Sequence, residues 1–169
     1  LRSQLDVGRG VYGSRITVRE GDCGTFKAPP YFARLIHVSG SASKRLEDEN
    51  VVSRVYKSVR PYGGVLWIEC ASSDAKAIEA AAGRAKLSNA EITAHEGAVM
   101  IRKQGALPGS ADWTHLYGDV ANTLKSDDTL VKAPLGLLWF GGNSNMDVLP
   151  RHGHGPSEQV IGGRLFIEG

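Results

Sequence analysis

The chain has 169 residues, of which 41% are hydrophobic and 22% are charged, a balance typical of a globular chain that can bury a core. Its 20 Lys and Arg residues stand against 18 Asp and Glu residues, and the net charge of +2 excludes the strongly basic surface of a nucleic-acid-binding domain. No apolar run reaches the ~20 residues that a membrane-spanning helix needs. The 2 cysteines are too few for a disulfide framework or a zinc site.

The distribution of charge and a stretch that contains Gly and Pro divide the sequence into two parts. Residues 1–107 contain 16 Lys and Arg against 11 Asp and Glu, whereas residues 108–169 contain 4 against 7, so the parts carry net charges of +5 and −3. Residues 105–110 (GALPGS) read as a linker at the same place. We therefore predict two domains, 1–107 and 108–169. The start at Leu1, without a signal peptide, and the strand-like end predict a piece of a longer chain.

The first part begins with alternating strand and helix patterns. Residues 15–19 (RITVR) alternate apolar and charged side chains, which predicts a strand that ends at a turn over Gly21 and Asp22. Residues 32–38 form a mostly apolar run, which predicts a strand covered on both faces. A helix is expected next, because apolar residues recur at helical spacing at Val52, Val55, Tyr56 and Val59.

A proline and two glycines end that helix within residues 60–64 (RPYGG), and residues 65–68 predict a second buried strand. Ser72, Ser73 or Asp74 is expected to cap the following helix. That helix has an apolar stripe at Ile78, Ala81, Ala82 and Ala85. Two short strands, 91–95 and 98–102, flank a hairpin turn at Glu96 and Gly97.

This order predicts an α/β fold with a largely parallel sheet and an antiparallel hairpin at its edge. The second part shows no helical period. Gly and Pro recur every few residues, Trp113 and Trp139 supply large apolar side chains, and a strand closes it within residues 156–168. That pattern predicts an all-β region of propeller or sandwich type.

Three motifs of the first part resemble class I S-adenosylmethionine-dependent methyltransferases. Residues 60–68 (RPYGGVLWI) are similar to the L-x-P-G-G-x-L turn before their fifth strand, and residues 51–59 are similar to the preceding E-x-x-R-V-L-K-x-L helix. Residues 16–22 (ITVREGD) resemble their strand that ends in Gly-Asp-Ala. The resemblance spans residues 8–105 and implies a partial Rossmann-like sheet that ends with an antiparallel strand. It also implies that Asp22 approaches the adenine amino group of the cofactor.

The departures from that family concern the cofactor site. The glycine-rich loop that holds the methionine moiety and the acidic ribose contact would both lie upstream of Leu1. Ala33 stands where the family's F-D-x-I strand carries an acidic residue. Residues 28–31 (APPY) lack the Asp or Asn of the amino-methyltransferase box and precede the strand instead of following it. A degenerate cofactor domain and a working enzyme both remain open.

The second part resembles the opening of pyrroloquinoline-quinone-type, or quinoprotein-like, β-propellers. Residues 112–123 are similar to their D-W-x-x-x-G-x-D-x-x-N-T segment, residues 137–139 (LLW) to an L-x-W strand, and residues 155–167 to the strand, glycine turn and strand of one blade. A methyltransferase-like domain followed by such a propeller is similar to large bacterial proteins of the planctomycete type. In quinoprotein dehydrogenases the quinone and its calcium bind in later blades.

Few residues qualify as site candidates. Asp22 is either the adenine contact or a turn-capping carboxylate. His152 and His154 form a His-x-His pair whose simplest interpretation is a polar loop. They are also weak candidates for metal ligands or for a ligand contact at the propeller mouth. Asp119 is expected to satisfy its own turn. We expect His37 to be a core histidine, and the two cysteines, Cys23 and Cys70, to be buried thiols.

Three functions are compatible with these features. The first is a propeller repeat protein with a ligand-binding or oxidoreductase function, which carries a methyltransferase-like domain. The second is a non-catalytic scaffold that binds a protein partner, and the third is a working methyltransferase whose propeller recruits its substrate. A true quinoprotein would be periplasmic and an active methyltransferase cytoplasmic. The chain itself is expected to be inactive, with exposed sheet edges and a dissociation constant for S-adenosylmethionine above about 10 μM.

Overall fold

A computed structural model describes residues 12–13, 15–136 and 157–167. Their elements, in chain order, are β1 (Leu35–Val38), the 3-10 helix η1 (Gly40–Glu47), α2 (Glu49–Lys57), β2 (Gly64–Glu69), α3 (Ser72–Arg84), β3 (Ala90–His95), β4 (Ala98–Lys103), β5 (Gln159–Ile161) and β6 (Arg164–Phe166). The first seven elements form an α/β unit, and β5 and β6 form a separate small sheet. No helix among the described residues is both long and apolar enough to cross a membrane.

The α/β unit contains one four-stranded sheet in the order β1-β2-β4-β3. β1 and β2 are parallel, whereas β4 is antiparallel to both β2 and β3. The hairpin that joins β3 to β4 turns at Glu96 and Gly97, as predicted, and Gly97 has a φ of +75°. The mixed α/β class is therefore confirmed. The predicted antiparallel hairpin at one edge of the sheet is also confirmed, whereas the expectation of a largely parallel sheet is wrong, because β4 is antiparallel to both of its neighbours.

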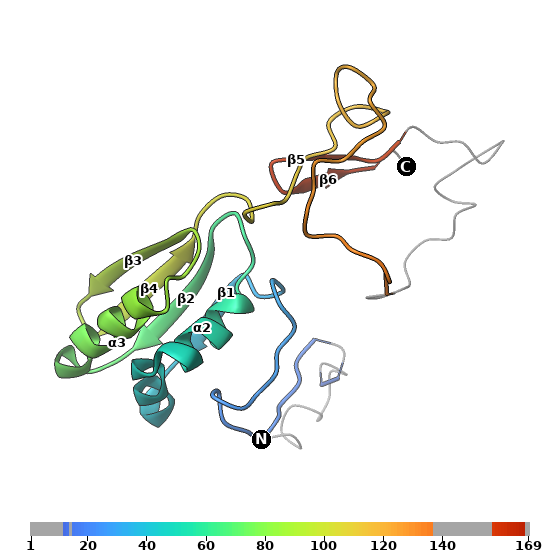
Figure 1. The fold of residues 1–169 in the computed structure, drawn as a ribbon. Coiled ribbons are helices and arrows are strands. Elements are labelled where there is room, and N and C mark those ends of the chain that lie inside the picture. The colour runs from blue at the N-terminus through green and yellow to red at the C-terminus, as the bar shows by residue number, and fades with distance from the viewer. Residues whose placement is uncertain (1–11, 14, 137–156, 168–169) are drawn as a thin grey trace.

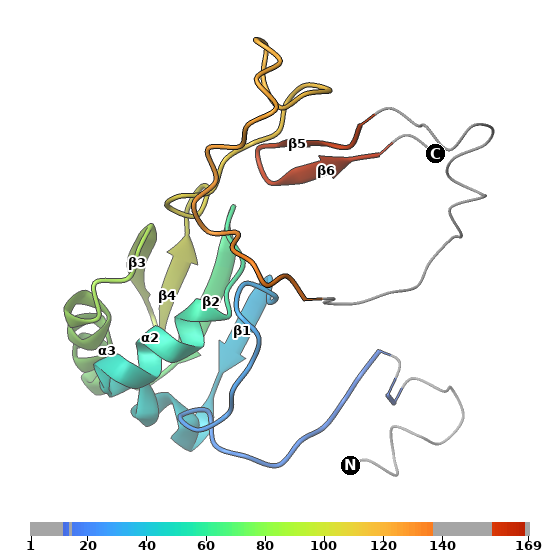
Figure 2. The same cartoon turned by 45° about the vertical axis from the view of Figure 1, so that its right-hand side comes forward.

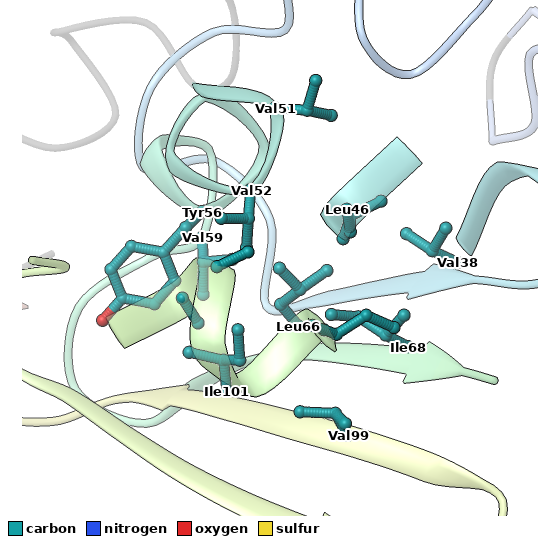
Figure 3. Close-up of a cluster of buried hydrophobic side chains, with 13 residues drawn as sticks. Val38, Leu46, Val51, Val52, Tyr56, Val59, Leu66, Ile68, Val99 and Ile101 are labelled. Carbon is teal, nitrogen blue, oxygen red and sulfur yellow. The ribbon is translucent and has the colours of Figure 1, made fainter. Parts of the chain in front are cut away.

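All helices cover the same face of this sheet (Figures 1 and 2). Between the layers lies a core in which the predicted stripe of α2 meets the inward residues of β2 and β4 (Figure 3). Its fully buried side chains include Leu46, Val52, Val59, Leu66, Ile68, Ile78, Val99 and Ile101. Burying such a side chain stabilises a fold by roughly 1.5–3 kcal/mol, so this single interface holds the α/β unit together.

A buried lysine at the end of β4 connects the helix layer to the sheet. Lys103 is 4% exposed, and its Nζ donates hydrogen bonds to the carbonyl oxygens of Tyr56 at 2.9 Å and Val59 at 2.8 Å. The ammonium lies 4.2 Å from the centroid of the Tyr56 ring and 5.1 Å from that of Tyr31. The free carbonyl oxygens at a helix C-terminus stabilise a nearby cation. The faces of the two tyrosine rings attract the ammonium as well.

The turn between α2 and β2 depends on its two glycines. Gly63 has a φ of +93°, which L side chains rarely adopt, and its N–H donates to the carbonyl of Lys103. A Cβ on Gly64 would lie 2.4 Å from the carbonyl oxygen of Arg60 and 2.7 Å from Cγ1 of Val59. Only glycine therefore allows β2 to begin this close to the end of the helix.

Two strand predictions in the first part need correction. Residues 15–19 form no strand, and Ile16 makes only an isolated bridge with Tyr12, because no described strand lies beside them to accept the ladder. The run 32–38 contains a strand only at Leu35–Val38, and it is covered on one face. Leu35 is 62% exposed because every helix lies on the other face of the sheet.

The helix boundaries also differ from expectation. Residues 40–47 form the 3-10 helix η1, which the sequence did not predict and whose Leu46 is fully buried. Asp48 caps α2 by accepting the N–H of Asn50 at 2.8 Å, and this hydrogen bond lowers the pKa of the Asp48 carboxyl. α3 has Ala71 as its N-cap without a side-chain hydrogen bond, so the predicted caps at residues 72–74 are wrong.

The second part contains one antiparallel pair, β5 and β6, joined by Gly162 and Gly163 at positive φ. Trp113 extends this pair, because it exchanges two backbone hydrogen bonds with Val160. The strand, glycine turn and strand predicted for residues 155–167 are therefore present within the described residues. They form a two-stranded sheet in which Trp113 is half-buried. The strand expected at residues 137–139, with Trp139, lies outside the described residues.

The two glycines of the RPYGG turn give a matched pair of variants. Gly64→Ala should lower the free energy of unfolding by about 3 kcal/mol, because the new methyl group overlaps backbone. Gly63→Ala meets no atom within 4 Å and should cost about 1 kcal/mol, for the positive φ alone. Urea unfolding monitored by circular dichroism measures both values, and equal losses would contradict the close approach at Gly64.

The Lys103 contacts predict an unusual alkaline stability profile. Burial lowers the pKa of Lys103 from 10.5 to about 8 and raises the pKa of Tyr56 from 10.0 to about 12. Between about pH 8 and pH 10.5, Lys103 is protonated in the unfolded chain but not in the folded chain, so the free energy of unfolding rises with pH. Between pH 10 and about pH 12, Tyr56 is protonated in the folded chain but not in the unfolded chain, so the free energy of unfolding falls with pH.

We therefore expect urea unfolding to show stability that rises with pH above about 8, because of Lys103, and falls again in the alkaline range. The thiols of Cys23 and Cys70, whose pKa values burial also raises, contribute to that fall together with Tyr56. Lys103→Met should abolish the rise and keep the fall, whereas Tyr56→Phe should keep the rise and make the fall smaller. A lysine variant that retains the rise would show that another group causes it.

Candidate functional site

Asp22 lies in a tight turn of the segment that precedes β1. Its Oδ1 accepts the N–H of Gly24 at 2.7 Å, and its carbonyl accepts the N–H groups of Thr25 and Phe26. The guanidinium of Arg45, on η1, lies 3.4 Å from the same Oδ1, with both side chains about half exposed. Such an exposed pair contributes less than about 1 kcal/mol. The turn-capping interpretation of Asp22 is therefore confirmed, and within the described residues both of these side-chain contacts are made by Oδ1.

A cavity of about 480 Å³ lies against this turn. Asp22 supplies its carboxylate, and Phe26 and Phe32, which are 47% and 60% exposed, supply aromatic walls. The remaining lining residues are Thr17, Arg19, Glu20, Gly21 and Cys23. Aromatic faces stack planar rings, and a carboxylate accepts hydrogen bonds from an amino group. The chemistry of this cavity therefore suits a planar heterocycle with an exocyclic amino group.

A second groove, of about 410 Å³, runs along β1 on the other side of the same two phenylalanines. Its floor is formed by residues 36–38 of β1 and by Ser39, which follows the strand. One wall is formed by Arg54 and Val55 of α2 and by Ser58, which follows the helix. The other wall is formed by Cys23, Phe26, Ala28 and Phe32. This groove is mostly apolar, which distinguishes it from the cavity at Asp22.

His37 is not a core histidine, contrary to expectation. Its side chain is 47% exposed on the uncovered face of the sheet, and its Nε2 lies 3.0 Å from Oε1 of Glu69 at the end of β2. On the same face the rings of Trp67 and His95 stack at 5.2 Å. Sequence periodicity could not reveal this, because a short apolar run does not show which face is covered.

The two thiols are partly buried and unpaired with each other. Burial raises the pKa of the Cys23 thiol, and the neighbouring charge of Asp22 adds to the effect. Burial also raises the pKa of the Cys70 thiol, with a smaller contribution from Asp74. Both thiols are thus held in the protonated form, as expected of cysteines without a reactive role.

In the second part, Asp119 satisfies its own turn as predicted. Its carboxylate accepts the N–H groups of Ala121 and Thr123 and the hydroxyl of Thr123, and the bonds from Thr123 lower the pKa of Asp119. His152 and His154 lie outside the described residues. Within the part of the chain that the structure describes, no three His, Cys, Asp or Glu side chains gather to hold a metal ion.

The site contains residues that sequence reasoning did not find. Arg45 reaches Asp22 across 23 positions of sequence. Phe26 and Phe32 line both hollows, and Arg54, on α2, lines the groove at β1. The sequence signal that could have indicated this site is the pair Phe26 and Phe32, which flank two prolines in the segment 26–32. Comparison with protein-family models, curated proteins and solved structures finds no match to this chain.

The protonated state of the two thiols predicts slow alkylation. At mildly alkaline pH, iodoacetamide should modify Cys23 and Cys70 several-fold more slowly in the folded chain than in urea, because a raised pKa lowers the thiolate fraction. Mass spectrometry of timed samples measures both rates. A cysteine that reacts faster in the folded chain would instead be an activated nucleophile.

Proposed function

We propose that residues 1–107 belong to a methyltransferase-like domain that binds the adenosine part of S-adenosylmethionine beside Asp22. In the same proposal, residues 108–169 begin a quinoprotein-like propeller with a ligand-binding or oxidoreductase function in its later blades. The observation that carries the first half of the proposal is the antiparallel hairpin that completes the sheet. The resemblance of residues 60–68 and 16–22 implies a domain whose last strand in the chain is antiparallel, and β4, the last strand of the α/β unit, is antiparallel to both of its neighbours.

The Asp22 cavity supports the cofactor assignment chemically. It combines one carboxylate with the aromatic side chains of Phe26 and Phe32. An adenine ring needs an apolar face for stacking and an acceptor for its amino group, and these three side chains supply both. Arg45 and the N–H of Gly24 hold the carboxylate from one side, so the second oxygen is the one that would accept the adenine amino group.

A non-catalytic scaffold is the second candidate, and two observations favour it. Ala33 occupies the position of the family's acidic strand residue; it is 9% exposed and pairs with Val59, so this position offers no carboxylate. The Asp22 carboxylate also serves its own turn. A methyltransferase-like domain without these carboxylate contacts could retain the fold and bind a partner without transferring a methyl group.

The second part supports the propeller assignment through its β5–β6 pair. The pair and Trp113 form the start of an antiparallel sheet, with Ile161, Leu165 and Phe166 exposed by 44–60%. Such apolar side chains require further strands for burial, as repeats of a propeller would provide. Pyrroloquinoline quinone and calcium would bind in those further repeats, so no residue described here is assigned to them.

A titration with S-adenosylmethionine tests the cofactor assignment. We expect weak binding, with a dissociation constant above about 10 μM, and amide shifts in nuclear magnetic resonance spectra confined to the Asp22 turn, Phe26 and Phe32. Asp22→Ala should remove those shifts, because the carboxylate that accepts the adenine amino group is lost.

Arg45→Gln is the matched control, because it removes the exposed ion pair and keeps the carboxylate. It should leave the ligand-induced shifts in place. No shift near Asp22 at millimolar ligand would eliminate the cofactor site and favour the scaffold. Binding that survives Asp22→Ala would show that the ligand occupies a different surface.

A further inference from the structure

A third hollow, of about 370 Å³, is lined from both parts of the chain. Its walls come from α2, from the end of α3, from Lys103 of β4, and from Leu107, Pro108 and Leu130. The volume lies within the range of small-molecule sites. The described residues that line it line neither the Asp22 cavity nor the groove at β1, so this hollow is independent of both.

Three lysines line this hollow. Lys57 is the last residue of α2, Lys86 lies just after α3, and Lys103 is the last residue of β4. Among the described residues that line the hollow there is no Asp or Glu, and in the described part of the chain none of the three lysines forms an ion pair. The hollow therefore carries a concentration of positive charge that attracts an anion.

The helix ends at this hollow do not cancel its charge. α2 and α3 both have their C-terminal ends here, and each such end carries roughly half of a negative charge. Two ends therefore offset about one of the three positive charges. Lys103 also keeps binding capacity, because an ammonium has three N–H groups and its hydrogen bonds to Tyr56 and Val59 use two of them.

Lys86 occupies its position against a backbone preference. It follows Ala85, the C-cap of α3, and has a φ of +48°. The residue at this position of a helix end is commonly glycine, which adopts a positive φ without strain. A strained residue that is not glycine, at the wall of a hollow, points to a role for its side chain. Here that side chain contributes an ammonium.

The apolar part of the hollow suits a planar ring. Tyr31 is 41% exposed, and its N–H donates to the carbonyl of Lys57 at 3.0 Å, which fixes it beside that lysine. The Nζ of Lys103 lies 5.1 Å from the centroid of the Tyr31 ring, so ring and charge adjoin each other. Leu107 and Leu130 supply further apolar lining. An aromatic ligand can stack on the tyrosine and fill this apolar space.

We infer that this hollow binds a small phosphate monoester of an aromatic ring, with the phosphate at the lysines and the ring against Tyr31. Such a phosphate carries roughly 1.5 to 2 negative charges at neutral pH and three acceptor oxygens, more than a carboxylate offers to several ammonium groups. Lysine binds phosphate as a point charge and needs no planar partner. The inference does not rest on the cofactor proposal, because Asp22 does not line this hollow.

The test uses the whole chain and phenyl phosphate, with inorganic phosphate, phenol and benzoate as comparison probes. Nuclear magnetic resonance titration at neutral pH follows the amides of Lys57, Lys86 and Ser88, which line the hollow. Phenyl phosphate should shift these amides with a dissociation constant of about 1 mM. Inorganic phosphate lacks the ring, phenol lacks the charge and benzoate carries a single charge, so each should bind several-fold more weakly.

Lys86→Gly removes an ammonium and relieves the positive φ, so the chain should stay folded and bind phenyl phosphate about fivefold more weakly. Lys76→Gln is the matched control, because it removes an exposed lysine of α3 that does not line the hollow. It should leave the affinity unchanged. Tyr31→Asn, which tolerates a positive φ, should weaken phenyl phosphate and leave inorganic phosphate unchanged.

Three results would overturn the inference. The first is the absence of shifts at the three amides with tens of millimolar phenyl phosphate. The second is equal weakening by Lys86→Gly and Lys76→Gln, which would show only a general attraction of anions to the chain. The third is benzoate that binds as tightly as phenyl phosphate, which would exclude a preference for phosphate.

Discussion

Beside the apolar core, a buried contact of Lys103 ties the end of β4 to the end of α2. The lysine is the last residue of β4, and its ammonium joins two carbonyls of the neighbouring helix end. Because Tyr56 packs its ring on that cation, the same residue serves the core and the ion site. The RPYGG turn begins where these bonds hold the chain, and Gly63 bonds back to Lys103. Helix end, turn and strand are thus linked at a single point.

The sheet has two unlike faces. α2 and α3 cover one face (Figure 2). The other face carries the contact of His37 with Glu69 and the stacked rings of Trp67 and His95. The parallel half of the sheet ends in an open strand, β1, and the Asp22 cavity and the groove at β1 lie beside it. Phe26 and Phe32 of the segment 20–32 line both of these hollows. Loops at the end of a rigid sheet commonly carry binding residues.

The candidate site was only partly visible in the sequence. The turn at Asp22 could be predicted because Gly and Asp adjoin a strand-like run, and the structure confirms the local hydrogen bond. Its contact with Arg45 could not, because those residues are far apart in sequence and meet only when η1 forms. His37 was misplaced for a related reason, since a core position and an exposed one in a four-residue strand have the same local sequence pattern.

The sequence by itself determined the elements whose signals are local: the stripes of α2 and α3, the glycine turn before β2, the β3–β4 hairpin and the β5–β6 turn. Periodicity and permitted backbone angles act within a few residues, so no partner is needed to read them. Only the tertiary structure decided that residues 15–19 remain outside the sheet, that β4 lies between β2 and β3, and that Lys103 is buried. Each of these depends on which segments meet in space, because a strand requires a neighbour and a buried charge requires acceptors from another element.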